Sequence, residues 1–277
     1  MIKMDSLIKN AFNGGYAIPQ FNINNLEWAK YILEACNDYN SPVILGVSEG
    51  AIKYMGGYNV VAAMVKAMIQ DLNIIVPVTL HLDHASTFLS CKKAIDAGFT
   101  SVMIDASKYP YEENVKITKE VVNYASKNNV SVEAEIGLIQ TGSNSVDYVD
   151  IDEAIKFYHE TSVLALAPSL GSVHGIYCGK PNLNYDNMKK LKENKVLFVL
   201  HGASGLSQED LSLSVSNGVC KVNINTDLQI AWAGAVKDYI SANPEVYDPR
   251  KIIASGEQAL KDVVYNKIKV LGSLNRA

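Results

Sequence analysis

The chain has 277 residues, of which 48% are hydrophobic and 19% charged, and its net charge is −4 at pH 7. This length suits one large domain or two small ones, and the weakly acidic balance gives no electrostatic reason to expect nucleic acid or an anionic membrane as partner. No apolar run reaches the roughly 18 residues of a membrane span, and the N-terminus lacks a signal-peptide core. The four cysteines are scattered, so we expect a cytoplasmic protein without disulfides.

Short apolar or β-branched runs alternate with segments of helical periodicity along the whole chain. The predicted strands are Ala17–Phe21, Pro42–Val47, Val76–Leu82, Ser101–Asp105, Ser131–Glu135, Leu164–Pro168, Leu197–Leu200 and Lys221–Asn225. Helices are predicted between them, for example at Leu26–Asn40, Phe88–Ala97, Asn114–Lys127 and Ile151–Glu160.

This alternation implies parallel strands joined by crossovers, and eight such units predict a (β/α)8 TIM barrel. A doubly wound open sheet is the alternative, although no GxGxxG motif follows the first strand. We expect a single domain over residues 1–277, in which the segment after Ser241 forms a C-terminal helical extension on the barrel.

Polar side chains follow every predicted strand. Active sites of barrel enzymes lie at the C-terminal ends of the strands, so these residues are predicted to meet at one rim. They are Asn22, Asn24, Ser48, Glu49, Asp83, His84, Asp105, Ser107, Glu135, His174, His201, Ser204, Asn223, Asn225 and Thr226.

Three of the five histidines, His84, His174 and His201, follow three different strands. Three imidazoles from separate elements, with an open fourth position, form a catalytic zinc site. The alternative interpretation is three hydrogen-bonded rim residues without a metal.

The segments HGASG and NINT follow the last two predicted strands. Small residues let backbone N–H groups approach an anion closely, and the loops after strands seven and eight commonly bind phosphate in this architecture. A metal, an anion pocket and carboxylates together suit a phosphorylated ketose whose carbonyl is polarised by zinc.

Nearly the whole chain resembles the class II, metal-dependent fructose-1,6-bisphosphate aldolases, a family that also contains tagatose-bisphosphate aldolases. The segments that carry the resemblance include HLDH, SVHG, LHGASG and VNINTD, in this order. The resemblance implies a glycolytic lyase that reversibly cleaves fructose 1,6-bisphosphate into dihydroxyacetone phosphate and glyceraldehyde 3-phosphate.

The same resemblance implies roles for individual residues. Zinc would be bound by the three histidines, with Asp105 and Glu135 near a second or alternate position for another metal or a monovalent cation. Asp83 would exchange a proton with the C4 oxygen. Arg250 would reach in from a neighbouring subunit of a homodimer or homotetramer. The implied substrate contacts are Asn22, Ser48, Gly171, Gly175, Lys180, Gly202, Ser204, Asn223, Asn225, Thr226 and Arg250.

The loop after the fifth strand departs from the family pattern GG-x-ED, whose glutamate removes the C3 proton. Ser143 and Asn144 stand in place of the two acids, and neither acts as a base near pH 7 without a partner. Cys178 stands where relatives often have a phosphate-binding lysine, and Lys180 lies two residues on. Three interpretations stay open: a fructose-bisphosphate aldolase with a substituted base, an aldolase for another ketose such as tagatose 1,6-bisphosphate, and a low-activity or non-catalytic sugar-phosphate-binding homologue.

Overall fold

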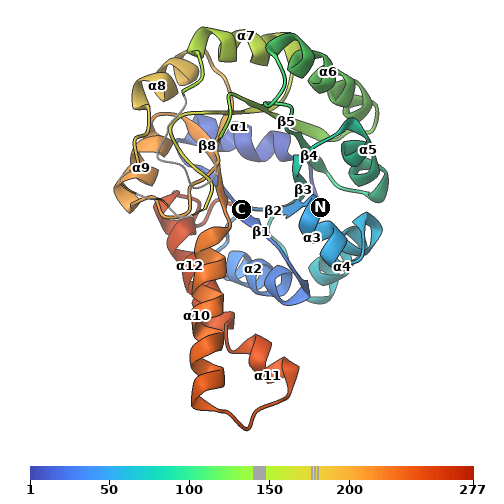
Figure 1. Cartoon of the computed structure of the whole chain (residues 1–277), viewed down its shortest axis with the longest axis vertical. Coiled ribbons are helices and arrows are strands. Elements are labelled where there is room, and N and C mark those ends of the chain that lie inside the picture. The colour runs from blue at the N-terminus through green and yellow to red at the C-terminus, as the bar shows by residue number, and fades with distance from the viewer. Residues whose placement is uncertain (140–147, 176, 178, 180) are drawn as a thin grey trace.

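Eight parallel strands form a closed barrel surrounded by helices (Figure 1). The computed structural model describes residues 1–139, 148–175, 177, 179 and 181–277. Neighbouring strands pair in chain order, and β1 pairs with β8 to close the ring. The strands are β1 Ile18–Asn22, β2 Val43–Ser48, β3 Val78–Ala85, β4 Ser101–Ile104, β5 Ser131–Ile136, β6 Ala165–Pro168, β7 Phe198–Leu200 and β8 Val219–Ile224. The predicted TIM barrel is confirmed, and closure rules out the open sheet.

Helices follow the strands around the outside of the barrel. They are α1 Met4–Gly14, α2 Leu26–Asp38, α3 Glu49–Tyr54, α4 Tyr58–Asp71, α5 Phe88–Ala97, α6 Tyr111–Lys127, α7 Ile151–Thr161, α8 Tyr185–Glu193, α9 Gln208–Ser216, α10 Thr226–Ala242, α11 Pro249–Ala254 and α12 Glu257–Val270. Side-chain caps fix several starts: Asn25, Thr87, Asp150 and Ser207 accept backbone N–H groups of α2, α5, α7 and α9. Among the described residues, no helix is long and apolar enough to cross a membrane.

The core has two apolar clusters, one between strands and helices and one inside the barrel. The inner cluster includes buried residues of α1, such as Met4 and Ile8, together with Ile18 and Val199 of the strands. Its other members come from β2, β4, β6 and β8 as well, so α1 closes the N-terminal end of the barrel.

Toward the C-terminal end the barrel interior becomes polar. On β5, Val132 and Ala134 pack among the surrounding helices, so strand alternation turns Glu133 and Glu135 inward. Lys221 of β8 is also fully buried. This layer of buried charge lies next to the rim where the predicted site residues gather.

Helices α10 and α11 project away from the barrel as an arm (Figure 1). No residue of α11 is buried, and α10 buries only Leu228 and Val236. The chain then returns through α12, which packs against α2 and α10.

Candidate active site

A pocket of about 230 Å³ opens at the C-terminal ends of the strands. Its residues come from the ends of six strands, and all of them were predicted from the sequence. They are Asn22, Asn24, Ser48, Asp83, His84, His174, Gly175, Gly202, Ser204, Asn223, Asn225 and Thr226.

The three predicted histidines meet at this pocket. One ring nitrogen from each of His84, His174 and His201 lies within 4.8 Å of the others. The ring centroids of His84 lie 5.0 Å from His174 and 4.7 Å from His201. Three convergent imidazoles from separate strand ends are a suitable donor set for a zinc ion.

A bulge in β3 allows two consecutive residues to serve the site. Alternation along a regular strand would turn Asp83 and His84 to opposite faces. The pairing of β3 with β4 shifts between Leu82 and Ala85, and His84 has a left-handed φ of 50°. A bulge of this kind redirects a side chain, at a cost of about 1–3 kcal/mol for the strained residue.

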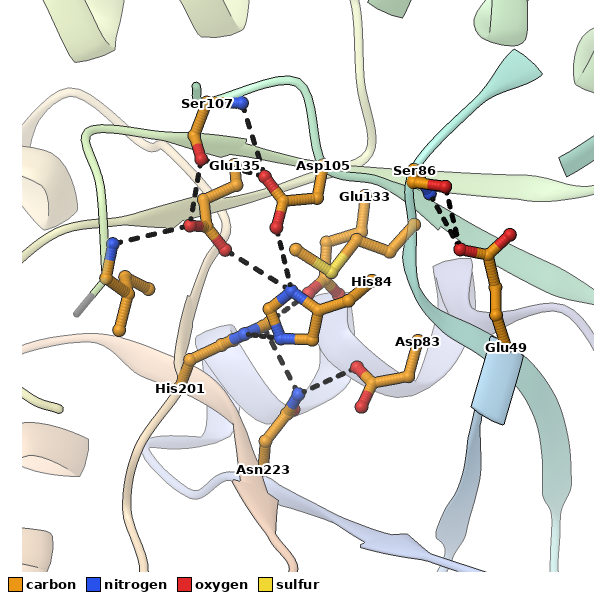
Figure 2. Close-up of polar contacts among 12 residues, drawn as sticks. Glu49, Asp83, His84, Ser86, Asp105, Ser107, Glu133, Glu135, His201 and Asn223 are labelled. Atoms are coloured by element: carbon orange, nitrogen blue, oxygen red, sulfur yellow. Dashed lines mark hydrogen bonds and ion pairs between the residues drawn. The ribbon is translucent and has the colours of Figure 1, made fainter. Parts of the chain in front are cut away.

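Carboxylates hold the far side of two histidine rings (Figure 2). His84 Nδ1 lies 3.1 Å from Asp105 Oδ2, and His201 Nε2 lies 2.8 Å from Glu133 Oε1. We therefore assign an N–H to each of these nitrogens, because a carboxylate accepts hydrogen bonds. His84 Nε2 and His201 Nδ1 remain as the inward-facing nitrogens.

These two nitrogens face each other at 2.9 Å. Two lone pairs at this distance repel unless a proton or a metal ion lies between them. Burial disfavours a charge on His84, but the Asp83 charge and the hydrogen bond to Asp105 outweigh it and raise its pKa to about 9. The two nitrogens therefore point toward a common position at the pocket.

His174 and His201 have the opposite tendency. Burial and the neighbouring histidines lower the pKa of His174 to about 3. Burial also lowers the pKa of His201, despite its hydrogen bond to Glu133. Both rings are therefore neutral at pH 7, which is the form that binds a metal.

Asp105 and Glu135 lie on the opposite side of His84 from His201 (Figure 2). Together with His84 they form a second group whose ligand atoms lie within 4.8 Å of one another. Burial and the nearby Asp105 charge raise the pKa of Glu135 to about 8. Among the described residues, Glu135 Oε2 has no hydrogen-bond partner. This group matches the predicted second or alternate metal position.

Asp83 is buried and held by two amide groups. Asn22 Nδ2 donates to Asp83 Oδ2 at 2.8 Å, and Asn223 Nδ2 donates to Oδ1 at 3.2 Å. Burial alone would raise the pKa of Asp83, but nearby positive charge, above all that of His84, holds it below its usual range. The carboxylate is therefore ionised and fixed in orientation beside the histidines.

The segments HGASG and NINT form the other side of the pocket, at the start of α10. Ser204 Oγ accepts the backbone N–H groups of Asn225 and Asp227 at 3.3 Å each. Among the described residues, the buried Asn225 Oδ1 has no hydrogen-bond partner. A helix N-terminus with a small-residue loop beside it suits the binding of a phosphate group.

Gly202 is required where this loop crosses the loop that carries His174. Its φ is 64°, and an added Cβ would lie 2.4 Å from the carbonyl oxygen of Val173. Tyr177 also joins the two loops, since its hydroxyl donates to the Gly202 carbonyl at 2.7 Å and accepts from Val173 N–H at 3.2 Å. The loop that carries His174 and the loop that carries Gly202 are therefore packed directly against each other.

Some predicted residues lie elsewhere. Gly171 does not line the pocket; an added Cβ there would lie 2.0 Å from the carbonyl oxygen of Asn182. Arg250 lies on α11 with its side chain 89% exposed and ion-paired to Asp248. Four residues discussed above, Lys180, Ser143, Asn144 and Cys178, lie outside the described residues.

Sequence reasoning missed two residues beneath the pocket, Glu133 and Lys221. Both are charged residues inside predicted strands, at positions that alternate with apolar residues. A charged residue that alternates with apolar residues in a barrel strand faces the barrel interior. This alternation was the signal in the sequence that could have identified both residues.

Comparisons with known proteins agree on one family. A family model described as "Fructose-bisphosphate aldolase class-II" matches residues 2–276. The fructose-bisphosphate aldolase of Geobacillus stearothermophilus is 48% identical over 283 positions, which cover 100% of this chain and 99% of that protein. The fructose-bisphosphate aldolase of Staphylococcus aureus strain N315 is 47% identical, with the same coverage.

Solved structures show the same likeness. The YdjI aldolase of Escherichia coli K12 matches with a TM-score of 0.89 at 32% identity, covering 100% of this chain and 99% of that one. The fructose-bisphosphate aldolase of Campylobacter jejuni matches with a TM-score of 0.85 at 26% identity, covering 100% and 96% of the two chains.

We predict that Gly202→Ala lowers the free energy of unfolding by about 1–3 kcal/mol, because alanine is strained at this φ and its methyl group collides with Val173. Zinc affinity should fall as well, since His174 follows Val173. Chemical denaturation and zinc titration measure the two effects. Gly234→Ala on α10 is the control: an added Cβ there meets nothing within 4 Å, so stability should hold or rise. Equal behaviour of the two variants would contradict the role of Gly202.

Proposed function

The chain belongs to the class II fructose-bisphosphate aldolase family, a metal-dependent family of aldehyde-lyases, and we propose that it cleaves fructose 1,6-bisphosphate in glycolysis. Cleavage is reversible and yields dihydroxyacetone phosphate and glyceraldehyde 3-phosphate. We further propose that the metal is zinc and that the enzyme acts in the cytoplasm.

The observation that carries the proposal is the group of three histidines beside an ionised, buried aspartate. His84 and His201 turn lone pairs toward one point, and His174 completes the set of donors. Nitrogen donors from three histidines with room for substrate are typical of catalytic zinc. Asp105 and Glu135 both contact His84 Nδ1, on the side of the ring away from His201. Together with His84 they form the proposed alternate position for a cation.

Zinc bound by these histidines would supply a Lewis acid toward the ketose carbonyl. Asp83 is the proposed acid/base. In cleavage its carboxylate takes the proton of the C4 hydroxyl as the C3–C4 bond breaks and the aldehyde forms. The electron pair of that bond passes into the enediolate of the other fragment, which takes a proton from solvent at C3 to become dihydroxyacetone phosphate. In condensation it returns that proton to the C4 oxygen. Asn22 and Asn223 hold the carboxylate in one orientation throughout, because each donates to a different oxygen.

The remaining pocket residues bind and orient the substrate in this proposal. Gly202 and Ser204 receive one phosphate at the N-terminus of α10, where Asn225 and Thr226 add polar groups. Asn223 contacts the dihydroxyacetone part, and Ser48 lies on the side of the far phosphate. Binding of both phosphates would fix which C–C bond lies next to Asp83 and the three histidines.

We propose that the enzyme is a homodimer or homotetramer in which Arg250 enters the site of a neighbouring subunit. The arm of α10 and α11 extends away from its own barrel (Figure 1), and the Arg250 side chain on α11 is 89% exposed. Large apolar side chains on the same arm, including Ile230, Ile240 and Tyr247, are exposed. A second subunit would cover them.

Zinc-loaded protein is expected to release triose phosphate from fructose 1,6-bisphosphate, to lose this activity on chelation and to regain it with zinc. His174→Ala should abolish stoichiometric zinc, because it removes one of the three nitrogen donors. A coupled assay with each ketose bisphosphate and metal analysis measure these outcomes. Turnover of tagatose 1,6-bisphosphate without turnover of fructose 1,6-bisphosphate would overturn the substrate assignment, and full zinc retention in the variant would overturn the ligand assignment.

A subunit-mixing experiment tests the shared site. Asp83→Asn and Arg250→Ala should each be weakly active alone. If Arg250 acts across the interface, mixed dimers contain one intact site, and statistical mixing should restore about a quarter of the wild-type activity. Assay before and after subunit exchange, with the mass determined by light scattering, measures this. A monomeric protein, or no recovery after exchange, would contradict the proposal.

A further inference from the structure

A fully buried ion pair lies beneath the three histidines. Lys221 Nζ of β8 is 2.8 Å from Glu133 Oε2 of β5, and both side chains are 0% exposed. Lysine and glutamate are almost never fully buried without a partner, because removing a charge from water is costly. A buried ion pair does not by itself show that it stabilises the fold, because well-packed apolar residues in its place often give equal stability. Its contacts indicate another role.

The first contact leads to the metal site. Glu133 uses its second oxygen, Oε1, to accept a hydrogen bond from His201 Nε2 at 2.8 Å. That bond places the His201 proton on Nε2 and leaves Nδ1 for the metal. His81 Nε2 lies farther from this carboxylate, 4.0 Å from Glu133 Oε2. Lys221 is therefore the close charged partner of Oε2, and it holds the carboxylate where His201 Nε2 can donate to the other oxygen.

The second contact leads to Asp83. Lys221 Nζ donates to Asn223 Oδ1 at 2.9 Å. An ammonium group has donors only, so Asn223 must present its oxygen to Lys221. Its amide nitrogen is thereby directed to Asp83 Oδ1, 3.2 Å away. Lys221 therefore fixes the position of this amide from the side opposite Asp83.

We propose that Lys221 is a positioning residue that orders both halves of the catalytic machinery: His201 through Glu133, and Asp83 through Asn223. This inference rests on the proposed function, because it concerns how that site is held. Outer partners of metal ligands fix the tautomer and direction of the ligand, and they are expected to affect metal affinity as well as rate.

The test uses the full-length protein and Lys221→Met, which keeps the length of the side chain and removes its charge and its donors. Zinc affinity of the apoprotein, measured by competition with a chromophoric chelator, should fall about 10–100-fold. At saturating zinc, kcat should also fall while KM changes little. The visible spectrum of the cobalt-substituted protein should shift, which loss of stability alone would not produce.

Two single variants separate the contact that runs through Glu133 to His201 from the contact that runs through Asn223 to Asp83. Glu133→Gln is expected to lower zinc affinity and shift the cobalt spectrum. Asn223→Ala is expected to lower kcat more strongly than zinc affinity, because Asn223 Nδ2 donates to Asp83 Oδ1 and also lies 3.2 Å from His201 Nε2. Lys261→Met is the matched control, since Lys261 joins α12 to α2 through an ion pair with Glu34 at 2.8 Å, outside the barrel. It should leave zinc affinity, kcat and the cobalt spectrum unchanged.

Wild-type zinc affinity and kcat in a folded Lys221→Met protein would overturn the proposal. If that variant does not fold, Lys221→Met combined with Glu133→Leu removes both charges and should fold. Weakened zinc binding in the double variant would support the proposal, and wild-type binding would overturn it. A wild-type protein that binds zinc but cleaves no ketose bisphosphate would refute the proposed function instead, and the zinc titrations would still test Lys221.

Discussion

The arrangement of the site depends on the balance of charge around Glu133. This carboxylate lies inside the barrel, out of contact with water, and is matched by Lys221 on one oxygen and by the His201 N–H on the other. Burial would raise its pKa, but the charge of Lys221 and the bond from His201 hold it low. An ionised acceptor at this depth fixes which nitrogen of His201 faces the pocket, and therefore where three donors converge.

The β3 bulge contributes the second constraint. It turns His84 toward His201 while Asp83 keeps its place beside Asn22 and Asn223. The proposed metal ligand and the proposed proton carrier thus come from adjacent residues of one strand, which keeps their separation short and fixed. The strain at His84 is offset by the hydrogen bond to Asp105 and by packing within a closed barrel.

Much of the fold was predictable because the strands read as short apolar runs at regular intervals, and a barrel brings their C-terminal ends to one rim. Ten of the twelve pocket residues were found on that basis; Gly202 was found from its small-residue loop and Gly175 from the family resemblance. The left-handed conformation of His84 was not predictable, because few residues other than glycine adopt a positive φ and a histidine in the sequence does not signal one. The pairing of Glu133 with Lys221 joins strands far apart in the chain, and spacing along the sequence does not reveal it. The position of Arg250 relative to a neighbouring subunit depends on assembly rather than on the fold of one chain.

The central claim is that carboxylates inside the barrel set the histidine tautomers so that nitrogens from three rings meet at one metal position. Nitrogen NMR of the histidine side chains in the zinc-loaded protein tests it most directly. We predict that His201 binds zinc through Nδ1 with a proton on Nε2, and that His84 binds through Nε2 with a proton on Nδ1. The reverse assignment for either ring, or histidine signals that do not change on addition of zinc, would contradict the account.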